Sequence, residues 1–258
     1  MPAMERNAMG WRRTCLALGV ALSLAGGARA ESEGSRVDLP VEQVEKIVRE
    51  YLLREPEIIY QALEELQRRQ AEAAAERQRA AVATNRAQLV DQAGDPVAGN
   101  PDGNVTVVEF FDYQCQYCRR VVPSLQALLA EDRDLKVVFK EFPILGEASV
   151  TAARAALAAR QQDRYLPFHF ALMDASDLSL DGIMAIAERV GLDTARLARD
   201  MGSPAIEAQL QANLELAREL GIEGTPAFVV GDALIPGAVD KTRLAQLIEE
   251  ARTDCVTC

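Results

Sequence analysis

Residues 105–118 of this 258-residue chain read Val-Thr-Val-Val-Glu-Phe-Phe-Asp-Tyr-Gln-Cys-Gln-Tyr-Cys. The run Val105–Phe111 is β-branched and aromatic apart from Glu109, which predicts a buried strand. A helical pattern follows over about 116–130, and a second apolar run, Leu135–Phe142, predicts another strand. Strand, helix and strand in such a short stretch form a βαβ unit, so we expect parallel strands joined by a right-handed crossover.

The pattern changes beyond this unit. Residues 149–221 have no strand signal and are rich in Ala, Leu and Arg, which predicts several helices. Strand patterns return at Ala227–Val230 and Ala233–Ile235, and the two-residue turn Gly231-Asp232 between them predicts a hairpin. Asp240 is predicted to cap a last helix. This order of elements is that of an α/β thioredoxin fold with an inserted all-helical domain.

The first thirty residues have the features of a secretory signal peptide. Arg12 and Arg13 precede an apolar run, Leu16–Leu24, and small residues in Ala28-Arg29-Ala30 suit cleavage after Ala30. The alternative is an uncleaved anchor. An exported protein meets an oxidising compartment, so disulfide chemistry becomes the leading hypothesis.

Two amphipathic helices are predicted between the signal peptide and the first strand. Val44, Ile47 and Val48 follow helical spacing, and Pro56 suits the first turn of a second helix that runs to about Leu89. One interpretation is a stalk that self-associates through its apolar faces, and the other is a solvated helical linker. The Gly-, Pro-, Asp- and Asn-rich stretch after the second helix marks a boundary.

The chain is therefore predicted to have five parts. They are a signal peptide at 1–30, a helical stalk at 31–92, a thioredoxin-like domain at 104–146 and 222–254, an inserted helical domain at 147–221 and a Cys-x-x-Cys tail at 255–258. Lys and Arg number 28 against 39 Asp and Glu, a formal net charge of −11, which argues against nucleic acid as a partner. A single histidine, His169, excludes a metal site with two histidine ligands.

Cys115 and Cys118 lie where the first strand meets a helix. The free N–H groups and the positive dipole at a helix N-terminus stabilise a thiolate on the first cysteine, and the second lies one turn further on. A thiolate at Cys115 can attack a substrate disulfide, and Cys118 can then resolve the mixed disulfide. Zinc ribbons also use Cys-x-x-Cys, but they need a second pair roughly 15–20 residues on. The next cysteine here is Cys255, which favours redox chemistry.

Three segments resemble the DsbA family of thiol–disulfide oxidoreductases, and in particular its ScsC-like branch with an N-terminal helical stalk. They are Glu109–Cys118, Phe139-Lys-Glu-Phe-Pro143 and Gly224-Thr-Pro-Ala227. The resemblance covers about residues 105–252, and more loosely 41–89. It implies a periplasmic enzyme that acts on cysteine-containing exported proteins, exchanges electrons with a membrane redox partner and forms a homo-oligomer, a trimer or a dimer.

The resemblance also implies roles for individual residues. The Thr225-Pro226 bond would be cis and the Thr225 backbone would pair with the substrate chain, whereas an ordinary trans turn is the alternative. Glu109 would be a buried acid with Lys140 as its neighbour, and would relay a proton to or from Cys118. The alternative is a glutamate that reaches the edge of the sheet.

The residues between the cysteines depart from the strongly oxidising members of the family. Those members carry a histidine there, whereas this chain has Gln116-Tyr117, which implies less thiolate stabilisation and a weaker oxidant. Thr225 in place of valine also resembles the isomerase and reductase branches. The predicted function is disulfide isomerase or reductase with no cofactor beyond its redox-active disulfide. The alternatives are a dithiol oxidase and a periplasmic protein that handles Cu(I) or Zn through its thiolates.

Two further features complete the predicted site. His169 is interpreted as a packed, hydrogen-bonded core residue. Cys255 and Cys258 are interpreted as an accessory tail disulfide, with a shuttle to the main site or a soft-metal site as alternatives.

Overall fold

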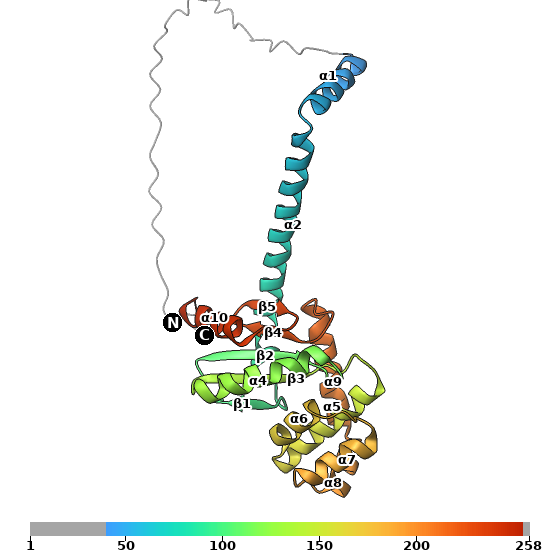
Figure 1. Ribbon diagram of the computed structural model, residues 1–258, viewed down its shortest axis with the longest axis vertical. Coiled ribbons are helices and arrows are strands. Elements are labelled where there is room, and N and C mark those ends of the chain that lie inside the picture. The colour runs from blue at the N-terminus through green and yellow to red at the C-terminus, as the bar shows by residue number, and fades with distance from the viewer. Residues whose placement is uncertain (1–39, 255–258) are drawn as a thin grey trace, which may run out of the picture. The chain divides into compact units, whose positions relative to one another are not determined.

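The computed structural model describes residues 40–254 (Figure 1). The chain forms two compact units, one that ends at Ile59 and another that begins at Tyr60. The predicted signal peptide and the cysteines Cys255 and Cys258 lie outside the described residues. In the first unit, α1 spans Val41–Arg54 and none of its residues is buried. The next helix, α2, starts after Pro56 and spans Glu57–Thr84.

The second unit is built on a five-stranded sheet in the order β1-β3-β2-β4-β5. The strands are β1 Val97–Gly99, β2 Val105–Phe111, β3 Leu135–Glu141, β4 Ala227–Val230 and β5 Ala233–Pro236. The central strands β2 and β3 are parallel and are joined by α4, which spans Gln116–Glu131, so the predicted βαβ unit is confirmed. The antiparallel pair β4 and β5 forms the predicted hairpin.

The edge strand β1 was not predicted, because it lies in the Gly- and Pro-rich stretch that was interpreted as a boundary. It pairs antiparallel with β3, with Val97 opposite Val138. A three-residue strand is too short for a periodic pattern, so its conformation comes from pairing with β3 rather than from its own sequence. Gly99, at φ +78°, ends this strand where a Cβ atom would lie 2.2 Å from the carbonyl oxygen of Leu135.

The inserted segment between β3 and β4 is all-helical, as predicted (Figure 1). Its elements are α5 Glu147–Ala159, the 3₁₀ turn η1 Arg160–Gln162, α6 Tyr165–Met173, α7 Leu180–Arg189, α8 Thr194–Asp200 and α9 Pro204–Glu219. The last helix, α10, spans Lys241–Asp254. The Oδ1 atom of Asp240 accepts a hydrogen bond from the Arg243 amide at 2.8 Å, which confirms the predicted cap.

The two faces of the sheet belong to different apolar clusters, because side chains alternate along a strand. Val107 and Phe111 of β2 face a large core that also contains residues of α4, α5, α6 and α10. Val108 and Phe110 face a smaller cluster with residues of α2, α3 (Arg86–Val90) and α9. The alternation therefore decides which polar side chain of a central strand reaches which cluster.

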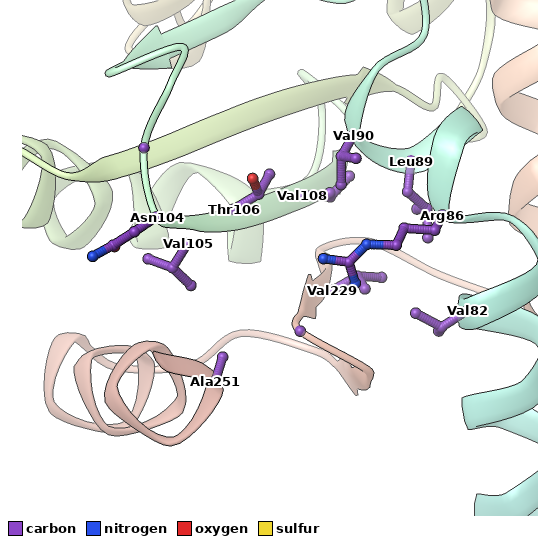
Figure 2. A pocket seen from close by; sticks show the side chains of 12 residues that line it. Val82, Arg86, Leu89, Val90, Asn104, Val105, Thr106, Val108, Val229 and Ala251 are labelled. Carbon is purple, nitrogen blue, oxygen red and sulfur yellow. The ribbon is translucent and has the colours of Figure 1, made fainter. Parts of the chain in front are cut away.

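The end of α2 and all of α3 are part of the second unit, which differs from the predicted stalk at 31–92. Val82 and Leu89 are each 1% exposed and pack in the smaller cluster. Figure 2 shows a small pocket beside them, where Arg86 and Ala251 approach the sheet from α3 and α10. No residue of the Cys115–Cys118 segment lines this pocket. A boundary at residue 92 would thus assign to the stalk residues that belong to the core of the sheet domain.

Candidate active site

Cys115 is the N-cap residue of α4. Its backbone is extended, at φ −73° and ψ 112°, and its Sγ atom accepts a hydrogen bond from the Cys118 amide at 3.4 Å. The N–H group that would otherwise lack a partner in the first turn is thus directed at the sulfur. Any negative charge that develops on Cys115 is stabilised by this amide and by the helix dipole.

The loop before β4 lies against the same sulfur. The Thr225–Pro226 peptide bond is cis, and the Cys115 thiol donates a hydrogen bond to the Thr225 carbonyl oxygen at 3.2 Å. The structure therefore brings together the cysteine pair and the Thr225-Pro226 segment, which are about 110 positions apart in the sequence. A polypeptide joined to Cys115 by a disulfide would lie beside the Thr225 backbone.

The two thiols differ in their surroundings. Both are free, Cys115 is 6% exposed and Cys118 is completely buried. Burial raises the pKa of the Cys118 thiol well above its ordinary value, and the nearby Glu109 raises it further, against a hydrogen bond from the Asp112 backbone. Cys118 therefore needs a proton acceptor before it can attack a disulfide.

Glu109 lies inside the sheet and not at its edge, which excludes the alternative of an edge position. It is 1% exposed on β2, a central strand, and its Oε1 atom is buried without a hydrogen-bond partner. Burial raises the pKa of Glu109 from an ordinary 4.5 to about 8. A carboxyl group with this pKa can take up or release a proton near neutral pH.

Lys140 is not the neighbour of Glu109, and this part of the prediction is wrong. In the β2–β3 register Glu109 is opposite Phe139, whereas Lys140 is opposite Phe110 and so points to the other face of the sheet. There its Nζ atom donates to the Gln88 carbonyl oxygen at 2.5 Å and to the Asp95 carboxylate. This buried ion pair fastens the segment that precedes β1 onto β3.

A second buried acid, Glu141, lies at the end of β3, and the sequence pattern predicted no role for it. Its Oε1 atom accepts hydrogen bonds from the hydroxyls of Tyr165, at 2.8 Å, and Tyr113, at 3.0 Å. Burial raises the pKa of Glu141 well above its ordinary range. The Tyr113 hydroxyl also lies 3.0 Å from Nδ1 of His169. These contacts join the segment before Cys115 to the helical insert.

His169 is a packed core residue, as predicted. It is 1% exposed and its ring contacts those of Phe111, Phe139 and Tyr165. Burial lowers its pKa from 6.5 to about 3, so the ring is neutral at ordinary pH. The Cys-x-x-Cys dipeptide, in contrast, lies at the surface: Gln116 is exposed, and Tyr117 is 57% exposed beneath the Arg120 guanidinium.

A thioredoxin fold that carries a dithiol at a helix N-terminus, next to a cis-proline loop, defines a class of proteins that exchange thiols and disulfides. The model of the DSBA-like thioredoxin domain matches residues 106–249, and the model of the N-terminal domain of the copper resistance protein ScsC matches residues 41–73. The chain belongs to the DSBA-like thioredoxin domain family, and its residues 106–249 form a domain of the thiol–disulfide oxidoreductase type found in DsbA and ScsC.

Solved structures support this assignment. A thioredoxin-like oxidoreductase from Silicibacter pomeroyi is 50% identical to this chain, with a TM-score of 0.64 over 66% of this chain and 98% of that one. A linker-deletion variant of ScsC from Proteus mirabilis is 31% identical, with a TM-score of 0.67 over 85% of this chain and all of that one. The resemblance to the ScsC-like branch is therefore confirmed.

A curated relative matches this chain over only part of its own length. The Na⁺/H⁺ antiporter NhaA of Herminiimonas arsenicoxydans is 30% identical over 165 residues, which are 63% of this chain and 26% of that protein. The chain thus spans about a quarter of the length of the first curated relatives that it matches. Between residues 40 and 254, no helix is both long enough and apolar enough to cross a membrane.

Proposed function

We propose that this protein is an exported disulfide isomerase or reductase that works as an oligomer on cysteine-containing proteins. The observation that carries the proposal is the combination of an N-capping thiol at Cys115 with exposed apolar faces on α1 and the first half of α2. The first feature supplies the exchange chemistry. The second can hold several catalytic domains around one substrate.

The first chemical step is the same for both activities. The Cys115 thiolate attacks one sulfur of a substrate disulfide, the substrate S–S bond breaks, and the other substrate sulfur leaves as a thiolate that takes up a proton. In isomerisation, a substrate thiolate then attacks the mixed disulfide and regenerates the Cys115 thiolate, so no net electrons are transferred. The Cys118 amide stabilises the charge on Cys115 at both ends of this cycle.

Reduction needs a second step, in which Cys118 takes part. Its thiol transfers a proton to the Glu109 carboxylate and its sulfur attacks the Cys115 sulfur. The S–S bond between Cys115 and the substrate breaks, the substrate sulfur leaves as a thiolate that takes up a proton from water, and the Cys115–Cys118 pair is left oxidised. Glu109 suits this role because its pKa of about 8 lets it hold or release the proton near neutral pH. A membrane dithiol partner would then return the protein to its reduced state. A dithiol oxidase would run the same steps in reverse.

The exposed faces of the two N-terminal helices favour association. Large apolar side chains on these helices are between 43% and 77% exposed in the single chain, and they are Val41, Val44, Ile47, Val48, Tyr51, Leu53, Ile59, Tyr60, Leu63 and Leu66. Exposed apolar side chains gathered in this number mark an interaction site. We infer that copies of this chain cover these faces with one another.

Removing residues 31–70 from the exported chain is expected to give a folded monomer. This deletion takes away the exposed apolar side chains but keeps Val82 and Leu89, which the sheet domain needs. The monomer should still reduce small disulfides, because Cys115 is unchanged, but should refold a scrambled disulfide protein poorly. Light scattering gives the mass, and an unchanged mass after the deletion would exclude this role of the helices.

The reduction potential of the Cys115–Cys118 pair separates the proposed activities from the alternative of an oxidase. We expect a potential below that of the strong oxidants, because Gln116 and Tyr117 add no positive charge beside the thiolate. Equilibration with glutathione buffers measures it. A value near about −120 mV, as found for strong oxidants, would favour the oxidase instead.

We propose in addition that Cys255 and Cys258 close a short disulfide that takes no part in turnover. Paired thiols in an oxidising compartment form disulfides readily. A variant with Cys255→Ser and Cys258→Ser is expected to keep wild-type turnover, and neither protein is expected to contain copper or zinc by elemental analysis. A large fall in turnover would make the tail part of the mechanism, and metal in the wild type alone would make it a soft-metal site.

A further inference from the structure

The Asp112 carboxylate lies directly before the catalytic turn and is 1% exposed. Its Oδ1 atom accepts hydrogen bonds from the Gln114 amide at 2.7 Å and from the Ser149 hydroxyl at 2.6 Å. Its Oδ2 atom accepts from the amides of Ile144, at 2.8 Å, and Leu145, at 2.9 Å. Four donors from three segments thus converge on one buried carboxylate.

These bonds join the catalytic turn to the loop between β3 and α5. Gln114, the residue before Cys115, adds two more links, because its Nε2 atom donates to the Leu145 carbonyl oxygen at 3.3 Å and to the Ser149 hydroxyl at 2.8 Å. Short-range preferences cannot hold this loop in place, since its partners are more than 30 positions away. Asp112 therefore determines where the loop lies relative to the thiol.

The loop between β3 and α5 exposes large hydrophobic side chains, which are otherwise rare on the surface of the domain. Between residues 67 and 253, four large hydrophobic side chains are exposed: Tyr117, Ile144, Leu145 and Leu180. Tyr117 lies in the first turn of the catalytic helix, and Ile144 and Leu145 lie on the loop bound by Asp112. Exposed apolar surface is thus concentrated at the catalytic thiol, which is the pattern expected of a binding surface.

We propose that Asp112 is a positioning residue that holds Ile144 and Leu145 beside Cys115, where they contact apolar side chains next to the attacked cysteine of an unfolded polypeptide. This inference rests on the proposed exchange reaction at Cys115. An unfolded chain is the occupant that fits, because it presents its apolar side chains around a cysteine, whereas a folded protein buries them. The loop is hydrogen-bonded to the turn that carries Cys115. The attacked cysteine and the apolar side chains that contact Ile144 and Leu145 must therefore belong to the same stretch of substrate.

The test compares two symmetrical peptide disulfides in single-turnover reactions of the reduced full-length protein. Each peptide has five residues with a central cysteine, flanked by leucines in one peptide and by serines in the other. One turnover breaks the peptide disulfide, releases two peptide thiols and forms the Cys115–Cys118 disulfide, so no further reductant is needed. The wild type is expected to reach half-saturation at about tenfold lower concentration of the leucine peptide, equivalent to about 1.4 kcal/mol.

Ile144→Ser, Leu145→Ser and Asp112→Asn are each expected to reduce the preference for the leucine peptide to less than threefold, through the half-saturation concentration and not through the limiting rate. Asparagine keeps the shape of Asp112 but replaces one acceptor oxygen by a donor group. The matched control is Leu180→Ser, which removes an equally exposed leucine from α7 and should keep the wild-type preference. Should Asp112→Asn fail to fold, Ser149→Ala, which removes one of the four donors, is expected to weaken the preference partly.

Several outcomes would overturn the inference. They are a wild type without preference between the peptides, a Leu145→Ser variant that keeps the preference, and a Leu145→Ser variant whose only change is a lower oligomer mass, which would make the loop a contact between copies. A wild type that reacts with neither peptide would instead refute the proposed exchange at Cys115, so the two failures can be told apart.

Discussion

Cys115→Ser is expected to abolish thiol–disulfide exchange, and Cys118→Ala is expected to accumulate mixed disulfides with substrate proteins. Serine cannot form a disulfide, so the first variant loses the attacking atom while the fold is kept. The second variant keeps the attacking sulfur but lacks the one that resolves the mixed disulfide. Non-reducing electrophoresis with mass spectrometry of the adducts measures both results.

The structure gives the reason for this asymmetry between the two thiols. Cys115 caps α4 and receives the Cys118 amide, whereas Cys118 is completely buried and burial raises its pKa. Alkylation of the reduced protein should therefore label Cys115 first. Cys118→Ala serves as the control, since its remaining site should be labelled at the wild-type rate. Preferential labelling of Cys118 would contradict the assignment.

Glu109→Gln is expected to change the pH dependence of stability by several kcal/mol. In the folded protein the pKa of Glu109 is about 8, against an ordinary 4.5, so the folded state keeps a proton that the unfolded state loses. The stability that this proton contributes is complete below pH 4.5 and is lost as the pH rises through 8. The loss amounts to about 3 kcal/mol at pH 7 and roughly 5 kcal/mol above pH 8.

Urea unfolding of the reduced proteins at pH 5 and pH 7 measures this effect. Relative to wild type, the free energy of unfolding of Glu109→Gln should rise by about 2.5 kcal/mol between these two pH values. The comparison with wild type cancels the contributions of other buried acids, such as Glu141 and Asp95. Glu188→Gln, in the exposed part of α7, is the control and should follow the wild type. If the free energy of unfolding changed equally between pH 5 and pH 7 in all three proteins, the pKa of Glu109 would not be raised by folding, and the carboxyl group would be ionised in the folded protein at pH 7.

The same substitution tests the proton transfer proposed for reduction. Without a carboxylate at position 109, Cys118 loses the group that accepts its proton, so mixed disulfides with substrate should persist longer at pH 7. Their lifetime is measured by acid quenching after single turnover. A lifetime equal to that of wild type would assign the proton transfer to another group.

The corrected position of Lys140 changes how the acid at position 109 is understood. A cation beside Glu109 would stabilise its ionised form and lower its pKa. Lys140 instead points to the opposite face and pairs with Asp95, so burial acts on Glu109 without a compensating charge. The pKa of Glu109 is therefore raised to about 8, so that its protonated form predominates at neutral pH while its ionised form stays accessible for accepting a proton.

Local patterns in the sequence determined the strands β2 to β5, the helical insert and the position of Cys115 at a helix N-terminus. Periodicity, turn residues and the Cys-x-x-Cys spacing are properties of short segments, so one sequence is enough to show them. The three-residue strand β1 has no such pattern, and pairing with β3 alone defines it. The resemblance to a known family, rather than any local pattern, pointed to Thr225-Pro226 beside the thiols.

Only the tertiary structure decided which groups meet across long stretches of chain. On β3, Phe139 lies on the same face of the sheet as Glu109, whereas the next residue, Lys140, lies on the face of Asp95. Both faces of the sheet are covered by apolar residues, so the sequence around Lys140 does not show which face its side chain reaches. In the sequence Asp112 is an ordinary turn residue. Only the structure shows that its carboxylate accepts hydrogen bonds from the amides of Ile144 and Leu145. Hydrogen bonds of buried polar groups depend on segments brought together by packing. For that reason sequence patterns identified the thiols but not Asp112, the residue that holds the loop at Ile144 and Leu145.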